Sequence, residues 1–300
     1  MKNAIAALSL LLAGTVVTAG QTPRVQNQTP NPADVEQMIA ALPAVAPASP
    51  ARPRRLLVLA HADEFVHSSI PLAARTVDEL GKKTGAWTTT VSYDPSVVTS
   101  ANLAAYDAVF LDSTTGHFLD DAASPTATDA RRTALLAFVR GGKGLAGIHG
   151  ASDSYHSPTK QPWPAFNPLI GGIFMAHPWQ HVWVKVEDPA NPITAAFTNP
   201  FEMTDETYTF AKEAYSRQNV HVLLSIDLSQ MPPEELAKEN RPWDHDYALS
   251  WIRREGSGRI FYTAHGHREQ VYAMRPFLAH LLAGIQYAMG DLQANDSPGN

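Results

Sequence analysis

The chain has 300 residues, of which 23 are Lys or Arg and 29 are Asp or Glu, so its formal net charge is -6. The hydrophobic content of 44% supplies a sizeable core, whereas the mild acidic balance without a basic run gives no electrostatic footprint for nucleic acid. The absence of Cys excludes disulfides, thiol nucleophiles and thiolate metal sites, which leaves the 12 His and the carboxylates to carry any chemistry.

The first 20 residues have the pattern of a secretory signal peptide. Lys2 gives a positive start, residues 4–17 form a short apolar stretch, and Val17 and Ala19 surround a possible cleavage point. We therefore expect an exported protein, periplasmic or secreted; the alternative is a buried N-terminal helix. No membrane span is expected in the mature chain, because spanning requires roughly 18 consecutive apolar residues.

Residues 21–53 contain seven prolines and are predicted to be an extended linker. Within this stretch, Asp34 to Leu42 could form one or two helical turns. One folded domain is expected over residues 54–292, and residues 293–300 are expected to be a tail.

From residue 54 onward, apolar runs of strand length alternate with helical periodicity. The predicted strands are 56–60, 87–93, 106–111, 145–149, 182–186, 220–226, 248–251 and 259–263. The predicted helices are 66–80, 129–140 and 277–289. Continuous apolar strands separated by helices predict an α/β protein whose parallel sheet is covered on both faces.

Polar side chains follow three of the predicted strands at the point where each strand ends. The sets are His61, Asp63, Glu64 and His67; His149 and Asp153; and His265 and His267. Ligands of open parallel sheets bind beyond the carboxyl ends of the strands, so we expect these groups to converge on one edge. His177 and Trp179, and further on Glu206 and Tyr208, lie between these sets in the sequence.

Several of these residues have an ordinary structural reading as well. His61 could cap backbone carbonyls, and Glu206 could be a solvated carboxylate in a loop rather than a general acid or base. His149 lies at a sharp strand-to-helix turn, where a nucleophile elbow would hold Ser or Cys, and imidazole is better suited there to acid, base or ligand roles. His265 and His267 would share one face of an extended chain, which suits joint binding of one ion.

Aromatic residues are numerous around these motifs. Aromatic rings pack against the C–H faces of sugars, but they also fill ordinary cores. The Trp residues in question are Trp163, Trp179, Trp183, Trp243 and Trp251.

Seven segments, in order, resemble the ThuA-like (trehalose utilisation) family, whose fold resembles class I glutamine amidotransferases. They are FVHSSI (65–70), YDAVFLDSTTG (106–116), GGKGLAGIHGASD (141–153), GGIFMAHPW (171–179), FEMTDETYTF (201–210), DYALSW (246–251) and GSGRIFYTAHGH (256–267). The resemblance implies a flavodoxin-like, amidotransferase-like parallel sheet with extra antiparallel strands in the second half. Glutaminase chemistry is excluded because no Cys stands at the turn beside His149.

The resemblance also implies a role in carbohydrate metabolism. One such role is the processing of 3-keto-glycosides derived from disaccharides. The recurrent polar positions of the family match His67, His149, Asp153, His177, Glu206 and His267. Val66 replaces a common Arg, His265 replaces a common Leu, and His61 is particular to this chain.

We assign catalysis to His149, His267, Glu206 and Asp153, and substrate binding to His67, His177, Trp179 and Tyr208. His61 and His265 are assigned to a divalent metal such as zinc, if one is bound. The expected function is a lyase, hydrolase or isomerase acting on a small-molecule carbohydrate. The alternative is a non-catalytic carbohydrate-binding or structural module on the same scaffold.

Overall fold

The computed structural model describes residues 26–156 and 162–299, so the predicted signal peptide lies outside the described residues. Within them, nine strands form one sheet in the order β2-β1-β3-β4-β9-β8-β7-β5-β6. The strands are β1 (Arg55–Leu59), β2 (Thr88–Ser92), β3 (Ala108–Asp112), β4 (Gly144–Ile148), β5 (Phe174–Val186), β6 (Phe201–Phe210), β7 (His221–Ile226), β8 (Ala248–Glu255) and β9 (Gly258–Thr263). The α-helices are α1 (Pro32–Ala41), α2 (Ile70–Thr84), α3 (Ser100–Leu103), α4 (Pro125–Arg140), α5 (Phe166–Ile170), α6 (Pro233–Leu236) and α7 (Arg275–Met289).

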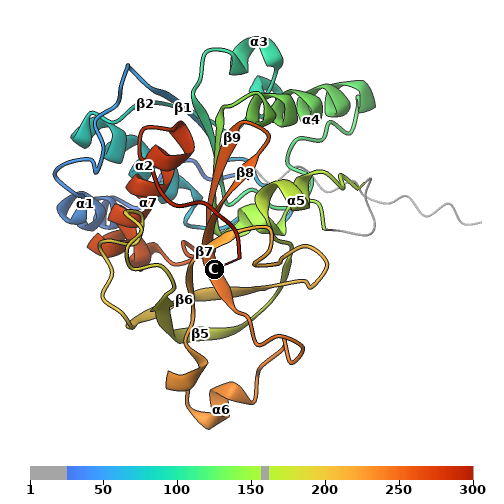
Figure 1. Cartoon of the computed structure of the whole chain (residues 1–300). Helices are drawn as coiled ribbons and strands as arrows, with labels where there is room; N and C mark the ends of the chain where they lie inside the picture. The colour runs from blue at the N-terminus through green and yellow to red at the C-terminus, as the bar shows by residue number, and fades with distance from the viewer. Residues whose placement is uncertain (1–25, 157–161, 300) are drawn as a thin grey trace, which may run out of the picture.

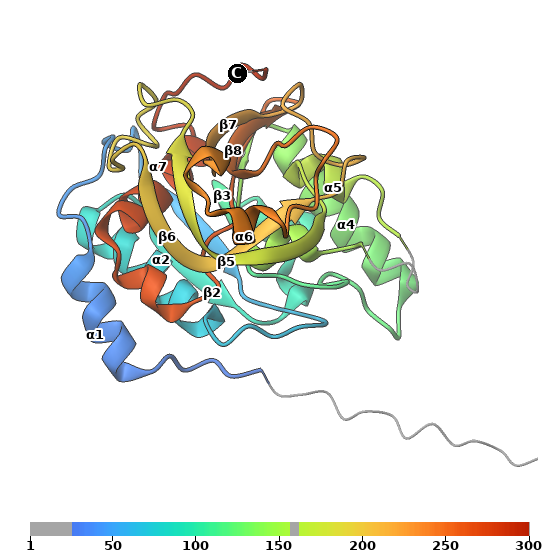
Figure 2. The ribbon, with the colours of Figure 1, turned by 90° about the horizontal axis from the view of Figure 1, so that it is seen from below.

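The first half of the sheet is parallel and lies between two layers of helices. Strands β2, β1, β3, β4 and β9 pair in parallel. Helices α1, α2 and α7 lie on one side of these strands, and α4 and α5 lie on the other (Figures 1 and 2). Strands β3 and β4 are buried along their whole length, which explains why they read as continuous apolar runs. The predicted flavodoxin-like α/β class is confirmed.

The second half of the sheet is antiparallel, as expected. Strand β8 pairs antiparallel with β9, and β7, β5 and β6 continue the sheet in the same manner. The stretch around Asp205 and Glu206, which could be a loop by sequence, lies instead inside strand β6. The strand is hard to recognise because Asp205, Thr207 and Thr209 are polar although they are buried. Period-2 alternation of apolar residues is therefore missing.

Parts of the predicted linker and of the predicted tail pack against the folded domain. Helix α1 packs against α2 and the 3-10 turn η4 (Glu269–Ala273), and its Met38 is fully buried. At the other end, the backbone carbonyl of Ser297 accepts a hydrogen bond from His221 Nδ1 at 2.8 Å. Among the described residues, no helix has both the length and the apolarity needed to cross a membrane.

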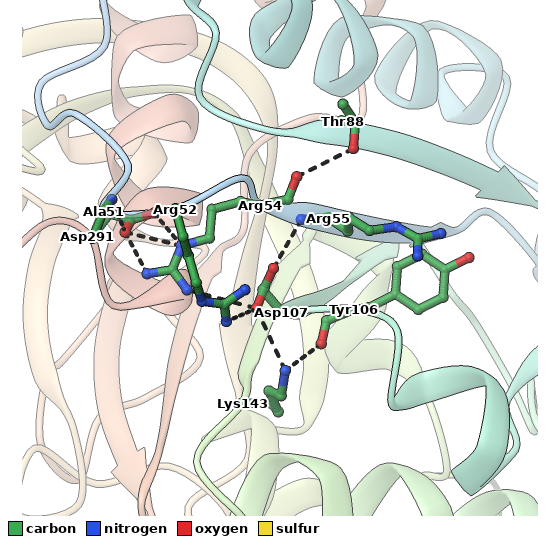
Figure 3. Close-up of polar contacts among 9 residues, drawn as sticks. All are labelled: Ala51, Arg52, Arg54, Arg55, Thr88, Tyr106, Asp107, Lys143 and Asp291. Carbon is green, nitrogen blue, oxygen red and sulfur yellow. Dashed lines mark hydrogen bonds and ion pairs between the residues drawn. The ribbon is translucent and has the colours of Figure 1, made fainter.

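A cluster of charged side chains joins the amino ends of the parallel strands (Figure 3). The Asp107 carboxylate precedes β3, accepts a hydrogen bond from the Arg55 amide at 3.0 Å and pairs with Arg52, Arg54 and Lys143. Burial alone would raise the pKa of Asp107, but these partners outweigh burial and hold the pKa below its ordinary value. Each charge in this cluster has an opposite partner, so we regard the cluster as structural.

Candidate active site

Three imidazoles meet at the opposite edge of the sheet, beyond the carboxyl ends of the parallel strands. His67 lies between β1 and α2, His149 directly follows β4, and His267 lies in the loop after β9. The ring centroids are 4.7 Å apart for His67 and His149, 5.2 Å for His67 and His267, and 5.0 Å for His149 and His267. The parallel topology brings them together, because it directs the carboxyl ends of all these strands to one edge.

The backbone at His149 is in a conformation that few side chains adopt. Its φ is +43°, in the left-handed region, where a residue other than glycine is strained by roughly 1–3 kcal/mol. The following residue, Gly150, is glycine, and a Cβ there would crowd Cε1 of His67 at 3.1 Å and the Ser113 carbonyl oxygen at 3.0 Å. This turn therefore directs the His149 ring towards the other two imidazoles at an energetic cost, as a nucleophile elbow would direct Ser or Cys.

Hydrogen bonds fix the His149 ring. Nδ1 lies 2.8 Å from the carbonyl oxygen of Ala264, which can only accept, so Nδ1 carries the proton. The lone pair is then on Nε2, which lies 3.1 Å from Nδ1 of His267. The geometry thus presents His149 Nε2 as a base or ligand atom.

The loop that carries His267 is held from three directions. The two carboxylate oxygens of Asp205 accept hydrogen bonds from the amides of Gly266 at 2.6 Å and Arg268 at 2.9 Å. The hydroxyls of Ser69 and Tyr272 both donate to the Gly266 carbonyl. Burial raises the pKa of Asp205 to about 7, although the backbone amides act in the opposite direction. Asp205 positions this loop and does not face the cavity.

Glu206, the next residue on β6, faces the cavity and meets two histidines. Its Oε2 lies 3.2 Å from Nδ1 of His267, and its Oε1 lies 3.7 Å from Nε2 of His177 on β5. The adjoining cavity of about 370 Å³ falls within the roughly 300–1,000 Å³ typical of small-molecule sites. It is lined by Phe65, His67, Asp153, Phe174, His177, Glu206 and Tyr208.

Burial keeps two of the three clustered imidazoles neutral. Desolvation, followed by the nearby His267, lowers the pKa of His67 to about 3. Desolvation, with His67 as the next contribution, also lowers the pKa of His149 well below its ordinary value. Both rings therefore offer lone pairs at neutral pH.

Of the residues assigned from sequence, seven are brought to this site: His67, His149, Asp153, His177, Glu206, Tyr208 and His267. Trp179 is not among them, which corrects its assignment to substrate binding. Its ring is fully buried and its Nε1 donates to the Glu235 carbonyl at 2.8 Å, so it is a core residue. The aromatic walls of the cavity come instead from Phe65, Phe174 and Tyr208.

The assignment of His61 and His265 to one metal ion is also corrected. The φ of +120° at Gly266 breaks the extended conformation that would have placed His265 and His267 on one face. His265 is buried instead, with Nδ1 3.8 Å from Asp205. His61 lies outside the cluster: the amide of the preceding Ala60 still pairs with Ser92 at the end of β2, and the carboxylates that act on His61 are those of Asp63 and Asp94.

Phe65 and Phe174 are cavity residues that were not singled out from sequence. Both stand two or three residues from an assigned histidine, and proximity to those motifs was the available signal. A larger cavity of about 760 Å³ lies near the end of β7, but its Arg217 already pairs with Glu187 and Asp246. We therefore assign the candidate site to the smaller cavity, which adjoins the three clustered histidines and Glu206.

Two solved structures show the same fold. A protein described as thua-like from Bacteroides uniformis is 20% identical over 81% of this chain and 94% of its own, with a TM-score of 0.62. Another thua-like protein, from Parabacteroides merdae, is 17% identical over 81% of this chain and 93% of its own, with a TM-score of 0.54. Comparison with curated protein sequences gives no match.

The family-level comparison covers most of the folded domain. The model of the ThuA family, described as trehalose utilisation, matches residues 55–288. This range includes all seven residues that the structure brings to the cavity and its edge. The chain belongs to the ThuA (trehalose utilisation) family.

Proposed function

We propose that this protein is a carbohydrate-processing enzyme that acts on a 3-keto-glycoside by acid–base chemistry. The observation that supports it most is the contact between Glu206 and His267 beside His149, in a cavity of small-molecule size. Family membership suggests disaccharide-derived substrates, and the aromatic side chains of Phe65, Phe174 and Tyr208 supply surfaces on which a sugar ring packs.

The first step is removal of a proton from the carbon beside the ketone. The C–H bond breaks, its electron pair forms an enolate, and the proton passes to the base. Glu206 and His267 form the basic pair, because Glu206 lines the cavity and its Oε2 lies 3.2 Å from Nδ1 of the partly exposed His267. Nε2 of His149 lies 3.1 Å from Nδ1 of His267, on which it can act as a hydrogen-bond acceptor.

The second step expels the glycosidic oxygen. The enolate electrons re-form the ketone and a carbon–carbon double bond while the C–O bond breaks, and an acid delivers a proton to the leaving oxygen. Asp153 and His177 line the same cavity as Glu206 and are the candidates for this acid. The products are an unsaturated keto-sugar and an alcohol, and addition of water completes a net hydrolysis.

We further propose that the protein is exported, which the signal-like pattern of residues 1–20 supports. A chain without Cys does not depend on an oxidising compartment for its stability, and this is compatible with folding after export. Expression of the full chain in a bacterial host, followed by fractionation and N-terminal sequencing, tests the idea. Retention of residues 1–20 on a cytoplasmic protein would contradict it.

The direct test of the enzymatic proposal is incubation with 3-keto-disaccharides, with and without chelator, followed by product analysis. Wild-type protein is expected to release a monosaccharide, and the His267→Ala variant is expected to lose this activity. Binding of the sugar without product formation would instead support a non-catalytic carbohydrate-binding module and would reject the enzymatic proposal.

A further inference from the structure

We propose that His67, His149 and His267 together bind one divalent transition-metal ion of the zinc class, with an open coordination position towards the cavity. One ring nitrogen from each histidine lies within 4.8 Å of the others, and this is the only such group of three or more His, Asp or Glu found across residues 26–156 and 162–299. The proposal deepens the proposed function, and it rests on that function only for the metal's chemical role.

Spacing is the first argument. Zinc–nitrogen bonds of about 2.0–2.1 Å in a tetrahedral site place two ligand nitrogens about 3.4 Å apart. Nε2 of His149 and Nδ1 of His267 lie 3.1 Å apart, close to that separation. The wider limit of 4.8 Å for the group as a whole requires only a small movement of His67 or His267 to complete the triangle.

The second argument is that hydrogen bonding within the protein satisfies these nitrogens only in part. His149 uses Nδ1 to donate to Ala264, which leaves the lone pair of Nε2 directed into the cluster. Nδ1 of His67 is buried and has no hydrogen-bond partner among the described residues. The single proton on Nδ1 of His267 cannot serve both His149 and Glu206, which lies 3.2 Å away. Buried polar atoms left without partners carry a free-energy cost that a bound cation would remove.

The third argument is the precision with which the ligands are held. Metal-binding histidines commonly donate their second ring nitrogen to a backbone carbonyl, and the His149–Ala264 hydrogen bond has this form. The strained φ of His149 fixes that ring, and the Asp205 carboxylate fixes the loop of His267. Three imidazoles without a thiolate favour Zn²⁺ or a similar ion over Mg²⁺ or Ca²⁺, which prefer oxygen ligands.

The bound ion would have a defined position relative to the substrate. His67 contributes to the wall of the cavity, so a fourth ligand, water or a sugar oxygen, enters from that side. Such an ion supplies Lewis-acid polarisation of a ketone oxygen. With the lone pair of His267 bound to the ion, Glu206 beside it is the member of the pair that can take a proton from the neighbouring carbon.

The test uses the full mature protein, stripped with chelator and titrated with Zn²⁺ or Co²⁺ in the absence of sugar. We expect one ion per chain, visible-region absorption bands for the Co²⁺ form that report nitrogen coordination, and no comparable binding of Mg²⁺. His267→Ala and His149→Asn are expected to weaken binding by at least about 100-fold. His181→Ala, which removes an exposed histidine on β5 outside the cluster, is the matched control and is expected to bind like the wild type.

The outcomes separate this inference from the proposed function. Absence of stoichiometric binding, or binding that survives in both cluster variants, overturns the metal site even if keto-sugar turnover is observed. Stoichiometric binding that depends on the three histidines supports the site even if no sugar is turned over. Should His149→Asn fail to fold, His267→Ala still decides, because that ring is partly exposed and its loss leaves the core intact.

Discussion

The polar clusters at the two edges of the sheet differ in how completely their charges and hydrogen-bonding atoms are partnered. At the amino edge, Asp107 is surrounded by Arg52, Arg54 and Lys143, so every charge has a partner. At the carboxyl edge, three imidazoles crowd around a strained residue, His149, and Nδ1 of His67 is buried without a hydrogen-bond partner among the described residues. The first arrangement lowers the free energy of the folded chain, whereas the second raises it in exchange for reactive groups in one place.

This contrast separates functional from structural polar clusters without reference to any relative. Both edges contain buried titratable side chains, so burial alone does not distinguish them. The difference lies in whether hydrogen-bond and charge partners are complete, as they are around Asp107 and are not around His67. The substitutions below test whether changes at the carboxyl edge reduce activity, while changes in the Asp107 cluster reduce stability.

The largest effect is expected for His267→Ala. The His267 ring contacts both Glu206 and His149, so its removal breaks the link between them. General acid–base groups typically contribute about 10²–10⁴-fold to the rate. We expect kcat/KM for the keto-sugar to fall by this factor, with the melting temperature nearly unchanged. Steady-state kinetics and thermal denaturation check it, with His181→Ala as control. Wild-type turnover in His267→Ala would remove His267 from the mechanism.

The next effect is expected for His149→Asn, which keeps a residue that tolerates positive φ. The amide cannot reproduce the Nε2 lone pair beside His267, so turnover should again fall by at least about 10²-fold. Because the backbone is not newly strained, circular dichroism should remain that of the wild type. Loss of the folded state in this variant would show that His149 is needed for folding as well.

Asp205→Asn should affect both properties. Its NH2 group would place N–H donors against the amide of either Gly266 or Arg268, while its oxygen still accepts from the other, costing about 1.5–3 kcal/mol of unfolding free energy. The loop of His267 should shift, and kcat should fall by up to about 100-fold while KM changes little. Urea denaturation and kinetics measure the two effects, with Glu202→Gln at an exposed position of β6 as control. Unchanged kcat would show that Asp205 does not position the site.

Asp107→Asn should reduce stability and leave turnover unchanged. The loss is expected to be about 1.5–3 kcal/mol at pH 7. Because the folded-state pKa of Asp107 lies below its ordinary value of 3.8, this contribution is complete above pH 3.8 and disappears as pH falls through the folded-state pKa. In urea denaturation at a series of pH values, the difference between variant and wild type should therefore be constant from pH 7 down to about pH 3.8 and shrink as the pH falls further.

A control for Asp107→Asn is Asp78→Asn, which removes an exposed pair with Lys82 on helix α2. Exposed pairs contribute only about 0–1 kcal/mol, so this variant should remain close to the wild type. Equal losses for the two variants would contradict the structural role given to the Asp107 cluster.

The smallest effect is expected for Phe65→Ala. The ring is largely exposed at the cavity, and its removal takes away packing against the sugar and an edge contact with His67, together about 0.5–1.5 kcal/mol. KM should rise about 2- to 12-fold with kcat nearly constant. Substitution of the exposed Val45 outside this cavity gives the background value. A larger change in kcat than in KM would assign Phe65 a different role.

The sequence was sufficient for the parallel half of the fold and for most of the site. Apolar runs such as 56–60 identify central strands, and the parallel topology then places His67, His149 and His267 at one edge. It was insufficient for strand β6, whose inward-facing Asp205 and Thr207 conceal the strand pattern.

The remaining errors concern side-chain direction. Gly266 turns the chain between His265 and His267, so residues two apart do not share a face. Trp179 lies in the same motif as His177, yet it lies inside the core because bulges interrupt strand β5 between them. A one-dimensional pattern does not record such bulges, and each of them changes which side chains reach the cavity.

The most direct test compares His267→Ala with Asp107→Asn on one 3-keto-disaccharide, measuring kcat/KM and melting temperature for both. The expected result is that His267→Ala loses about 10²-fold or more in activity and keeps its stability, while Asp107→Asn keeps its activity and loses stability. If His267→Ala turns over substrate like the wild type, or if both variants lose activity only in proportion to their loss of stability, the carboxyl edge is not a catalytic site.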